Sequence, residues 1–494
     1  MTDRRIAFRL GCLLALGLAI LHRGHFMSTD ELGLFFQTRS LSQELSLAVP
    51  PRLPMAYPGQ AGKSYSQYTI GQSLLAVPFH AAGRLLQPVL PLAVQHGLRG
   101  PIGPISWNGL PPLAFFPILL YPPVATGVLG ALFFLFERRL GASRGASLAA
   151  TLVLASCTQA ALMSTLFLQH TTECIGALGA FYFWHRFRES GAARDVLLGS
   201  AFASSILNVR VAGAIDGLAL GGYLLFVCGE RFRAQRDVRW LATSALLALI
   251  PLAASVALYG WVNELKWGHW LESPMLDERG RMRLELGTAL TGFLVSPGMS
   301  IFLYSPLLLL LPVTLPRLLR TFPAETCAVV ALFVSRLLFY SSYELWTGLF
   351  SCPGPRYLFT ALVFLMLPLG PWLGRARAPG RAAFFGLAAL GAVVQLLSVI
   401  PSWAKIVVGE GYGTWQPPFG FLFEPETAPL MAAARRAFDP GYLDVWIAQI
   451  ALGWDGQGPA PGVAGVVALC WLAAMLLLAQ RLRQAVATSD QALR

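Results

Sequence analysis

Residues 6–31 read IAFRLGCLLALGLAILHRGHFMSTDE, an apolar run from Ile6 to Leu21, a short polar connection and an acidic pair, Asp30 and Glu31. Arginines precede the run, which is typical of a retained signal anchor that starts in the cytoplasm and crosses outward. Asp30 and Glu31 would then lie outside the cytoplasm, within a few residues of the bilayer. Carboxylates held so close to lipid, in a chain this apolar, indicate a functional site.

The composition of the whole chain indicates a membrane protein. Of its 494 residues 55% are hydrophobic and only 13% are charged, whereas soluble domains have about 25% charged residues. A spanning helix needs about 20 mostly apolar residues, and about twelve such stretches alternate with short loops. They are continuous rather than alternating, which excludes a lipid-facing β-barrel. We therefore expect an all-α polytopic membrane protein with about twelve transmembrane helices.

The formal net charge of +12 does not indicate nucleic-acid binding, because the basic residues gather at alternate helix ends. That distribution is the cytoplasmic bias which orients membrane proteins. The seven cysteines form no C-x-x-C pair and show no zinc-site spacing, so we interpret them as packing residues and expect no metal or other cofactor. The basic clusters at alternate helix ends are Arg4–Arg5, Arg138–Arg139, Arg186/Arg188, Arg231/Arg233/Arg236/Arg239, Arg317/Arg320, Arg375/Arg377/Arg381 and Arg481/Arg483.

Placing every basic cluster in the cytoplasm gives one path through the membrane. A long outer loop, 23–110, contains two amphipathic segments, Glu31–Leu47 and Tyr68–Leu86, which we expect to be juxtamembrane helices. If the second segment crossed the membrane, the cluster at Arg138 would lie outside. After the first helix the expected spans are 112–136, 146–166, 170–187, 195–209, 211–229, 238–260, 298–316, 323–341, 357–373, 382–400 and 463–480.

The long loops all fall on the outer face, so the function is expected there. We divide the chain into a transmembrane catalytic region (1–400), an outer loop (401–462), and a final helix with a cytoplasmic tail (463–494). Short, arginine-rich inner loops suit a bacterial inner membrane, with the active site on the periplasmic side.

Several ionisable and aromatic residues fall at the same outer ends as Asp30 and Glu31. Three are cations and are candidates for binding a phosphate. The others are candidates for binding substrate, and His170 and Glu173 share one helix face because they are three residues apart. The cations are Lys63, Arg210 and Arg356, and the remaining candidates are Tyr65, Tyr68, His170, Glu173, Trp346 and Tyr357.

Each candidate also has a structural interpretation. Lys63 and Arg356 would serve as interfacial anchors if their long side chains reached the headgroups. The tyrosines and Trp346 would belong to an aromatic belt, and His170 and Glu173 would form a hydrogen-bonded pair. Asp30 would cap a helix, since Ser28-Thr29-Asp30 is a good N-cap sequence.

Carboxylates beside cations at an outer membrane surface suit one reaction well. Transfer of a sugar from a lipid phosphate needs cations for the departing phosphate and a carboxylate to accept the proton of the attacking hydroxyl. We assign Asp30 as this base, in a single displacement with inversion.

The same residues resemble the GT-C superfamily of membrane glycosyltransferases, in particular the branch of protein O-mannosyltransferases and aminoarabinose transferases (glycosyltransferase family 39). The resemblance covers most of the first 375 residues. It is carried by the segments HFMSTDE (25–31), YSQYTIGQSLL (65–75), FLVSPG (293–298), LYSP (303–306) and GPRYL (354–358).

By this resemblance, Asp30 is the acidic residue of the first outer loop, Glu31 completes an acidic pair, and Lys63 and Arg356 bind the lipid phosphate. It implies a hexosyl- or pentosyltransferase that uses a polyprenyl-phosphate sugar donor without a metal. The chain departs from the family in lacking a sizeable soluble C-terminal domain, so the acceptor is open: a glycan, a lipid or a protein.

Two other functions compete with the glycosyltransferase. A transporter or flippase of a lipid-linked sugar would use the same cations, but it needs charged residues deep within the spans, where Arg336 is the main candidate. A non-catalytic scaffold of the cell envelope would leave the cluster of outer charges unexplained.

Overall fold

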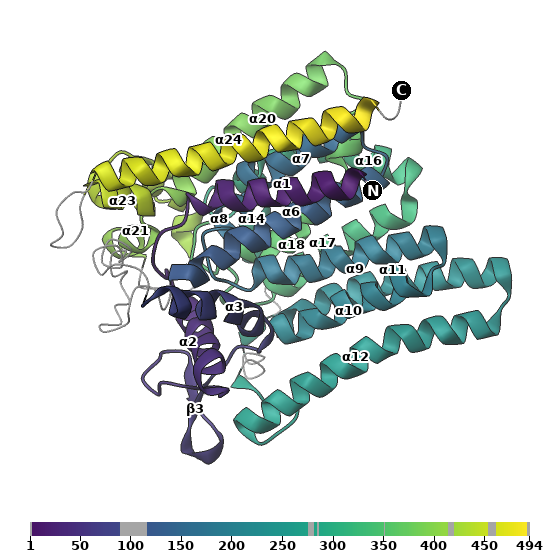
Figure 1. The fold of residues 1–494 in the computed structure, drawn as a ribbon, viewed down its shortest axis with the longest axis horizontal. Coiled ribbons are helices and arrows are strands. Elements are labelled where there is room, and N and C mark those ends of the chain that lie inside the picture. The colour runs from purple at the N-terminus through teal and green to yellow at the C-terminus, as the bar shows by residue number, and fades with distance from the viewer. Residues whose placement is uncertain are drawn as a thin grey trace.

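The computed structural model describes residues 2–88, 116–274, 281–283, 286–349, 351–412, 419–452 and 461–491. Long helices lie roughly side by side, and the first loop folds against one end of them (Figure 1). We call the end that carries α2 (Thr29–Glu44) and α3 (Gly71–Leu86) the site end. The opposite end carries the N-terminus of α1, where Asp3 forms ion pairs with Arg138 and Arg144.

Within the described part of the chain, seven helical segments are long and apolar enough to cross a membrane. Two of them expose leucines along their length, such as Leu246 and Leu249 on α12 (Val238–Trp267) and Leu469 and Leu476 on α24 (Pro461–Gln491). Apolar side chains on the outside of such helices belong in lipid, so this is an integral membrane protein. The segments are Pro117–Arg139, Val211–Gln235, Val238–Trp267, Pro323–Ser341, Arg356–Leu373, Ala378–Val399 and Pro461–Val486.

The all-α fold class is as expected, but the count of twelve spans is not confirmed. The expected span 146–166 is interrupted at Thr158, where the backbone is extended and the side chain accepts a hydrogen bond from Ala160 N–H. The expected span 298–316 is interrupted before Pro306, whose ring restricts the preceding residue and removes a backbone donor.

Helix α18 lies inside the bundle, where every one of its residues is buried. The bundle consists of α1 (Thr2–Ala19), α6 (Tyr121–Arg139), α7 (Arg144–Cys157), α8 (Gln159–Met163), α9 (His170–Ser190), α10 (Ala193–Val209), α11 (Ala214–Gln235), α12 (Val238–Trp267), α14 (Gly287–Val295), α15 (Ile301–Tyr304), α16 (Leu311–Thr321), α17 (Pro323–Ser341), α18 (Phe359–Met366), α19 (Leu369–Leu373), α20 (Ala378–Val399) and α24 (Pro461–Gln491).

Close packing of α1 against α6 requires glycine. A Cβ on Gly127 would lie 2.4 Å from the carbonyl oxygen of Gly11, and a Cβ on Gly11 would lie 2.9 Å from the Gly127 oxygen. Small residues let two membrane helices approach in this way. The contact fixes α1, and with it the connection to the acidic pair.

The first loop contains the two expected helices and a small sheet that the sequence did not predict. The expected segments Glu31–Leu47 and Tyr68–Leu86 form α2 (Thr29–Glu44) and α3 (Gly71–Leu86), which pack against each other. The sheet has the antiparallel order β1-β3-β2, with β1 Ala48–Val49, β2 Ala56–Pro58 and β3 Ser64–Ser66. The rest of the predicted loop, 89–110, lies outside the described residues, as do residues 111–115.

The expected outer loop 401–462 is folded over its described part. Its helices are α21 (Trp403–Gly409), α22 (Pro429–Arg436) and α23 (Trp446–Leu452). Buried Asp444 joins this segment to the start of the first loop. Its carboxylate accepts hydrogen bonds from Arg23 Nη1 and from His25 Nε2, both at 2.7 Å.

The pair of His25 and Asp444 makes stability depend on pH. Burial lowers the pKa of His25, but the charge and hydrogen bond of Asp444 outweigh it and the net shift is upward from 6.5. Burial raises the pKa of Asp444, but His25 and Arg23 outweigh it and the net shift is downward from 3.8. Because folding raises the pKa of His25, the contribution of His25 to stability is complete below pH 6.5. Because folding lowers the pKa of Asp444, the contribution of Asp444 is complete above pH 3.8.

We therefore predict that the detergent-solubilised protein is most stable between these two values. Its melting temperature should fall as the pH rises through the folded-state pKa of His25. The His25→Asn variant should be less stable in that window and should lose most of this dependence, whereas His269→Asn, which changes an exposed histidine, should keep it. Parallel pH profiles for wild type and His25→Asn would contradict the ion pair.

Candidate active site

Asp30 lies in the first turn of α2, at the site end of the bundle. Its Oδ1 accepts a 2.7 Å hydrogen bond from the Tyr68 hydroxyl, and its Oδ2 lies 3.6 Å from Nη2 of Arg356. The Asp30 side chain is 25% exposed, so part of the carboxylate is open to a ligand. The partial positive charge of a helix N-terminus favours a carboxylate there.

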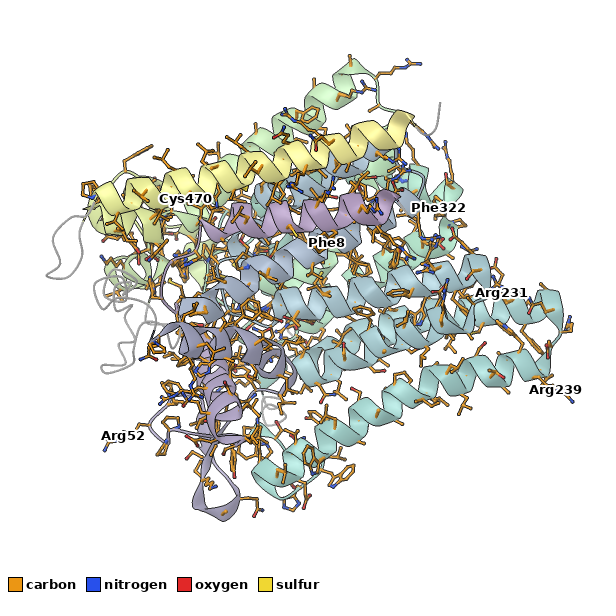
Figure 2. All side chains as sticks on the ribbon, in the orientation of Figure 1. Phe8, Arg52, Arg231, Arg239, Phe322 and Cys470 are labelled. Atoms are coloured by element: carbon orange, nitrogen blue, oxygen red, sulfur yellow. The ribbon has the colours of Figure 1, made fainter. Side chains whose placement is uncertain are left out.

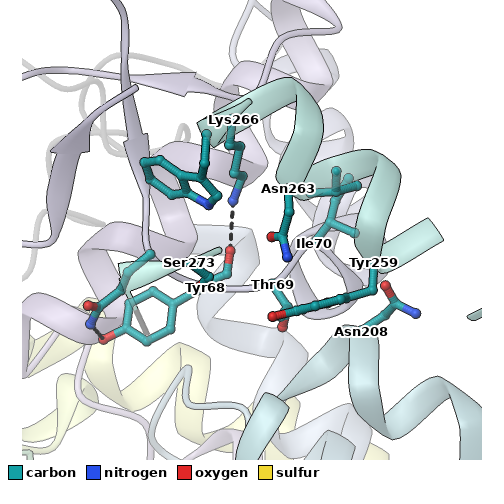
Figure 3. A pocket seen from close by; sticks show the side chains of 11 residues that line it. Tyr68, Thr69, Ile70, Asn208, Tyr259, Asn263, Lys266 and Ser273 are labelled. Atoms are coloured by element: carbon teal, nitrogen blue, oxygen red, sulfur yellow. Dashed lines mark hydrogen bonds between the residues drawn. The ribbon is translucent and has the colours of Figure 1, made fainter. Parts of the chain in front are cut away.

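Tyr68 is held in place from behind by Lys266, near the end of α12. The buried amino group donates a 2.8 Å hydrogen bond to the backbone oxygen of Tyr68 (Figure 3). It also donates to the backbone oxygen of Ser66 at 3.0 Å and to the side chain of Gln37 at 2.8 Å. Burial raises the pKa of Tyr68 well above 10, and the Asp30 charge adds to this. The hydroxyl therefore stays protonated and donates to Asp30.

Glu31 points away from Asp30 and has no exposed surface. Its Oε2 accepts from the N–H groups of Met27 and Ser28, at 2.7 and 3.0 Å, and its Oε1 accepts from Phe167 N–H at 2.6 Å. Together with the Ser28 side chain this forms a capping box at the start of α2. The expected acidic pair is therefore divided: the structure gives Glu31 the task of fixing the helix start, and only Asp30 faces a possible ligand.

Arg356 reaches Asp30 from a turn that glycine makes possible. Gly348 and Gly354 have φ values of +57° and +83°, which favour glycine. A Cβ on Gly348 would also lie 2.6 Å from Nε of Arg356. The Arg356 guanidinium is buried rather than extended to the membrane surface, so it is not an interfacial anchor.

Two nitrogens of Arg356, Nε and Nη1, are buried and have no hydrogen-bond partner among the described residues. The same is true of both ring nitrogens of His170 and of the Tyr340 hydroxyl. Buried donors normally find partners, and leaving them unpaired costs free energy. Arg356 is thus equipped to bind an anion beside Asp30.

Arg356 and a second arginine, Arg210, lie beside a pair of stacked tyrosine rings. Tyr340 and Tyr357 stack at a centroid separation of 4.7 Å and an interplanar angle of 3°. Arg210 lies 5.4 and 5.3 Å from these two rings, and Arg356 lies 5.1 Å from Tyr357. His170 lies 6.0 Å from Tyr357 on another side. Such cation–π contacts hold the guanidinium groups against a rigid surface.

Arg210 belongs to a buried charge network together with Arg336. Glu173 accepts hydrogen bonds from Arg210 at 3.0 Å and from Arg336 at 2.6 Å, and Arg336 also donates to Asp216 at 3.3 Å. The carboxylates of Glu173 and Asp216 have no exposed surface. Each of these buried charges has an opposite charge beside it, although Nε of Arg336 and Oδ1 of Asp216 have no hydrogen-bond partner among the described residues. Arg210 and Arg336 also join the network to the Tyr340 ring.

The structure brings together seven of the expected site residues and leaves others apart. Direct contacts, or contacts through one other residue of the group, connect Asp30, Tyr68, Arg356, Tyr357, His170, Arg210 and Glu173.

Lys63, Tyr65 and Trp346 do not join this group. Lys63 is exposed in the turn between β2 and β3, and no described contact links it to Asp30 or Arg356. Tyr65 packs edge-on against Trp267, and Trp346 packs against Phe293. Binding of phosphate by Lys63 and of substrate by Tyr65 and Trp346 stays a prediction from the sequence, without support from these contacts.

The sequence interpretation missed the residues that act at a distance. Lys266, Asp216 and Asp444 each bind partners more than a hundred residues away. A charged residue inside an apolar helix was the available signal for Lys266 and Asp216. Among the described residues, no group of three or more His, Cys, Asp or Glu side chains could hold a metal ion.

The arrangement of helices is similar to that of known membrane glycosyltransferases. The aminoarabinose transferase ArnT from Cupriavidus metallidurans, bound to undecaprenyl phosphate, superposes with a TM-score of 0.52 at 14% identity, over 97% of this chain and 73% of ArnT. Apo ArnT gives 0.51 over the same shares, again at 14% identity. The chain matches no protein-family model and no curated protein sequence. The fold is therefore GT-C-like, as the sequence resemblance implied.

The cap at α2 predicts a specific loss of stability. In Glu31→Gln one carboxylate oxygen becomes an NH₂ group, which must then face a backbone N–H donor. We expect this to cost about 1–3 kcal/mol of unfolding free energy. Glu44→Gln, at the exposed end of α2, should change stability by less than about 0.5 kcal/mol. Thermal unfolding in one detergent compares them, and equal melting temperatures would contradict the cap.

The turn that positions Arg356 predicts opposite effects for two glycine substitutions. Gly348→Ala should destabilise the protein by about 1–3 kcal/mol, because the residue has positive φ and its Cβ would meet Arg356. Gly221→Ala lies within α11, where a Cβ meets no atom within 4 Å, and should stabilise by about 0.5–1 kcal/mol. Shifts of the melting temperature in the same direction would count against the turn.

Proposed function

We propose that this protein is an integral-membrane glycosyltransferase that moves a sugar from a polyprenyl-phosphate donor to an acceptor hydroxyl. The observation that carries the proposal is the pairing of a partly open Asp30 with Arg356, whose Nε and Nη1 have no partner among the described residues. A base and an anion-binding cation are the two groups that this reaction needs side by side.

Asp30 is the general base. It accepts the proton of the acceptor hydroxyl while the acceptor oxygen forms a bond to the anomeric carbon of the sugar. The bond between that carbon and the phosphate oxygen breaks, and its electron pair leaves with the polyprenyl phosphate. Because Glu31 is committed to backbone amides, a single carboxylate acts, which favours one displacement with inversion.

Arg356 binds the donor phosphate and stabilises the negative charge that develops as the phosphate departs. Tyr357 and Tyr340 hold the arginines in place, and Tyr340 or His170 supplies a further donor to the phosphate or the sugar. Arg210 adds positive potential from its ion pair with Glu173. The polyprenyl chain lies between helices at the site end.

The likeness to ArnT supports a lipid phosphate as part of the substrate, since the ArnT structure holds undecaprenyl phosphate. The distribution of charge supports an extracytoplasmic site. Arg138, Arg139 and Arg231 lie at the end opposite Asp30, and basic residues favour the cytoplasm. We propose that in a bacterium the reaction takes place on the periplasmic face of the inner membrane.

A transporter of a lipid-linked sugar is the second candidate, since Glu173, Asp216 and Arg336 are buried charges inside the bundle. These groups pair with one another, however, and Arg336 directs both terminal nitrogens to carboxylates. Mutual pairing of this kind serves structure better than passage of a substrate, even though Nε of Arg336 and Oδ1 of Asp216 have no partner among the described residues.

The base assignment predicts a separation of binding from turnover. Asp30→Asn should lower transfer of radiolabelled sugar from a polyprenyl phosphate to an envelope extract by at least about 10²-fold, while donor binding by the purified variant is retained. Asp3→Asn, at the opposite end, should remain active. Full transfer by Asp30→Asn would contradict its role as base, and transport by a turnover-inactive wild type would favour the second candidate.

The phosphate assignment predicts a loss of donor affinity. Arg356→Ala should weaken binding of polyprenyl phosphate by about ten- to a hundredfold, because a charge-assisted contact contributes about 1.5–3 kcal/mol. Arg356→Lys should recover only part of the affinity, since lysine lacks the planar fork. Arg52→Ala, an exposed arginine elsewhere in the first loop, is the matched control. Unchanged affinity in Arg356→Ala would remove the phosphate from this position.

A further inference from the structure

The end of the bundle opposite Asp30 contains a cavity of 820 Å³, within the range of about 300–1,000 Å³ that is usual for ligand sites. It lies between α16, the connection from α19 to α20, and the end of α6. Phe322 lines it, and Figure 2 shows this residue at the same end as Arg231 and Arg239, away from Arg52. The active site and this cavity are therefore separate.

Three arginines line the cavity beside an otherwise largely apolar wall. Arg317 projects from the last turns of α16, and Arg375 and Arg377 come from the connection between α19 and α20. All three are exposed, and among the described residues none has a carboxylate within ion-pair distance. Their positive charge is thus left for a ligand.

A buried hydroxyl adds a polar group to the wall. Thr314 is 1% exposed, lines the cavity from α16, and its Oγ1 has no hydrogen-bond partner among the described residues. A threonine in a helix ordinarily bonds to a backbone oxygen of the preceding turn. The neighbouring acidic group, Glu137, is fully buried and accepts from Gly370 N–H, and it does not line the cavity.

We propose that this cavity is a binding site for an anionic glycerophospholipid of the leaflet at this end of the protein. The phosphate binds among Arg317, Arg375 and Arg377, the Thr314 hydroxyl donates to an oxygen of the headgroup or ester, and an acyl chain packs on the apolar wall. Basic pockets between membrane helices bind such headgroups. The site lies away from Asp30, so its occupant is a structural lipid rather than the sugar donor, and the inference does not depend on the proposed function.

Native mass spectrometry of the full-length protein in detergent tests the proposal. The protein is titrated separately with phosphatidylglycerol, phosphatidylcholine and inorganic phosphate, and the retained adducts are counted. Wild type should retain one phosphatidylglycerol in preference to phosphatidylcholine. The combined variant Arg317→Gln/Arg375→Gln/Arg377→Gln should weaken this binding by about fivefold for each arginine removed.

Two further variants distinguish lipid binding in the cavity from nonspecific attraction of lipid by positive charge. Arg233→Gln/Arg239→Gln/Arg320→Gln removes the same charge from arginines that do not line the cavity, and should bind phosphatidylglycerol like wild type. Ala383→Trp fills the cavity without changing its charge, and should also lose the lipid. Equal loss in both triple variants, unchanged binding in Ala383→Trp, equal retention of phosphatidylcholine, or displacement of the lipid by inorganic phosphate would each overturn the proposal.

Discussion

The buried arginines Arg23 and Arg336 are paired with buried carboxylates, and much of the rest of the structure follows from that pairing. Lipid offers no partner for an ion, so an unpaired one is costly. Asp444 neutralises Arg23, and Glu173 and Asp216 neutralise Arg336, each at hydrogen-bonding distance. These pairs join segments that are far apart in sequence. They therefore fix the positions of helices and loops relative to one another more specifically than apolar packing alone would.

Arg356 departs from this pattern, and the departure defines the site. Its carboxylate partner, Asp30, lies at 3.6 Å rather than at bonding distance, and two of its nitrogens have no partner among the described residues. Asp30 in turn takes its short hydrogen bond from Tyr68 and remains partly exposed. An incompletely paired cation beside an open carboxylate is unfavourable in the free protein, and an anionic ligand would relieve it. Strain of this kind is characteristic of functional sites.

The sequence predicts part of this arrangement. Assigning basic clusters to one side brought Asp30, Arg210 and Arg356 to the same end, because the charge bias that orients helices acts locally. The role of Glu31 was also readable, since Ser28 and Glu31 have the spacing of a capping box, but the adjacent acidic residue invited a catalytic interpretation. Breaks at Thr158 and Pro306 divide segments that hydropathy alone joins.

Other contacts could not be predicted, because they depend on tertiary structure. Lys266 reaches Tyr68 across 198 positions, and His25 reaches Asp444 across 419. Neither pair has a local pattern, and a lysine near a helix end ordinarily extends to the membrane surface. Lys266 turns inward because three oxygen acceptors converge on it, and two of them are backbone oxygens whose positions follow from the turn before α3. The Asp30 carboxylate, which we propose as the base, is thus oriented through Tyr68 by a residue that contacts neither Asp30 nor Arg356. The candidate residues can be selected from local sequence, whereas their alignment requires the folded chain.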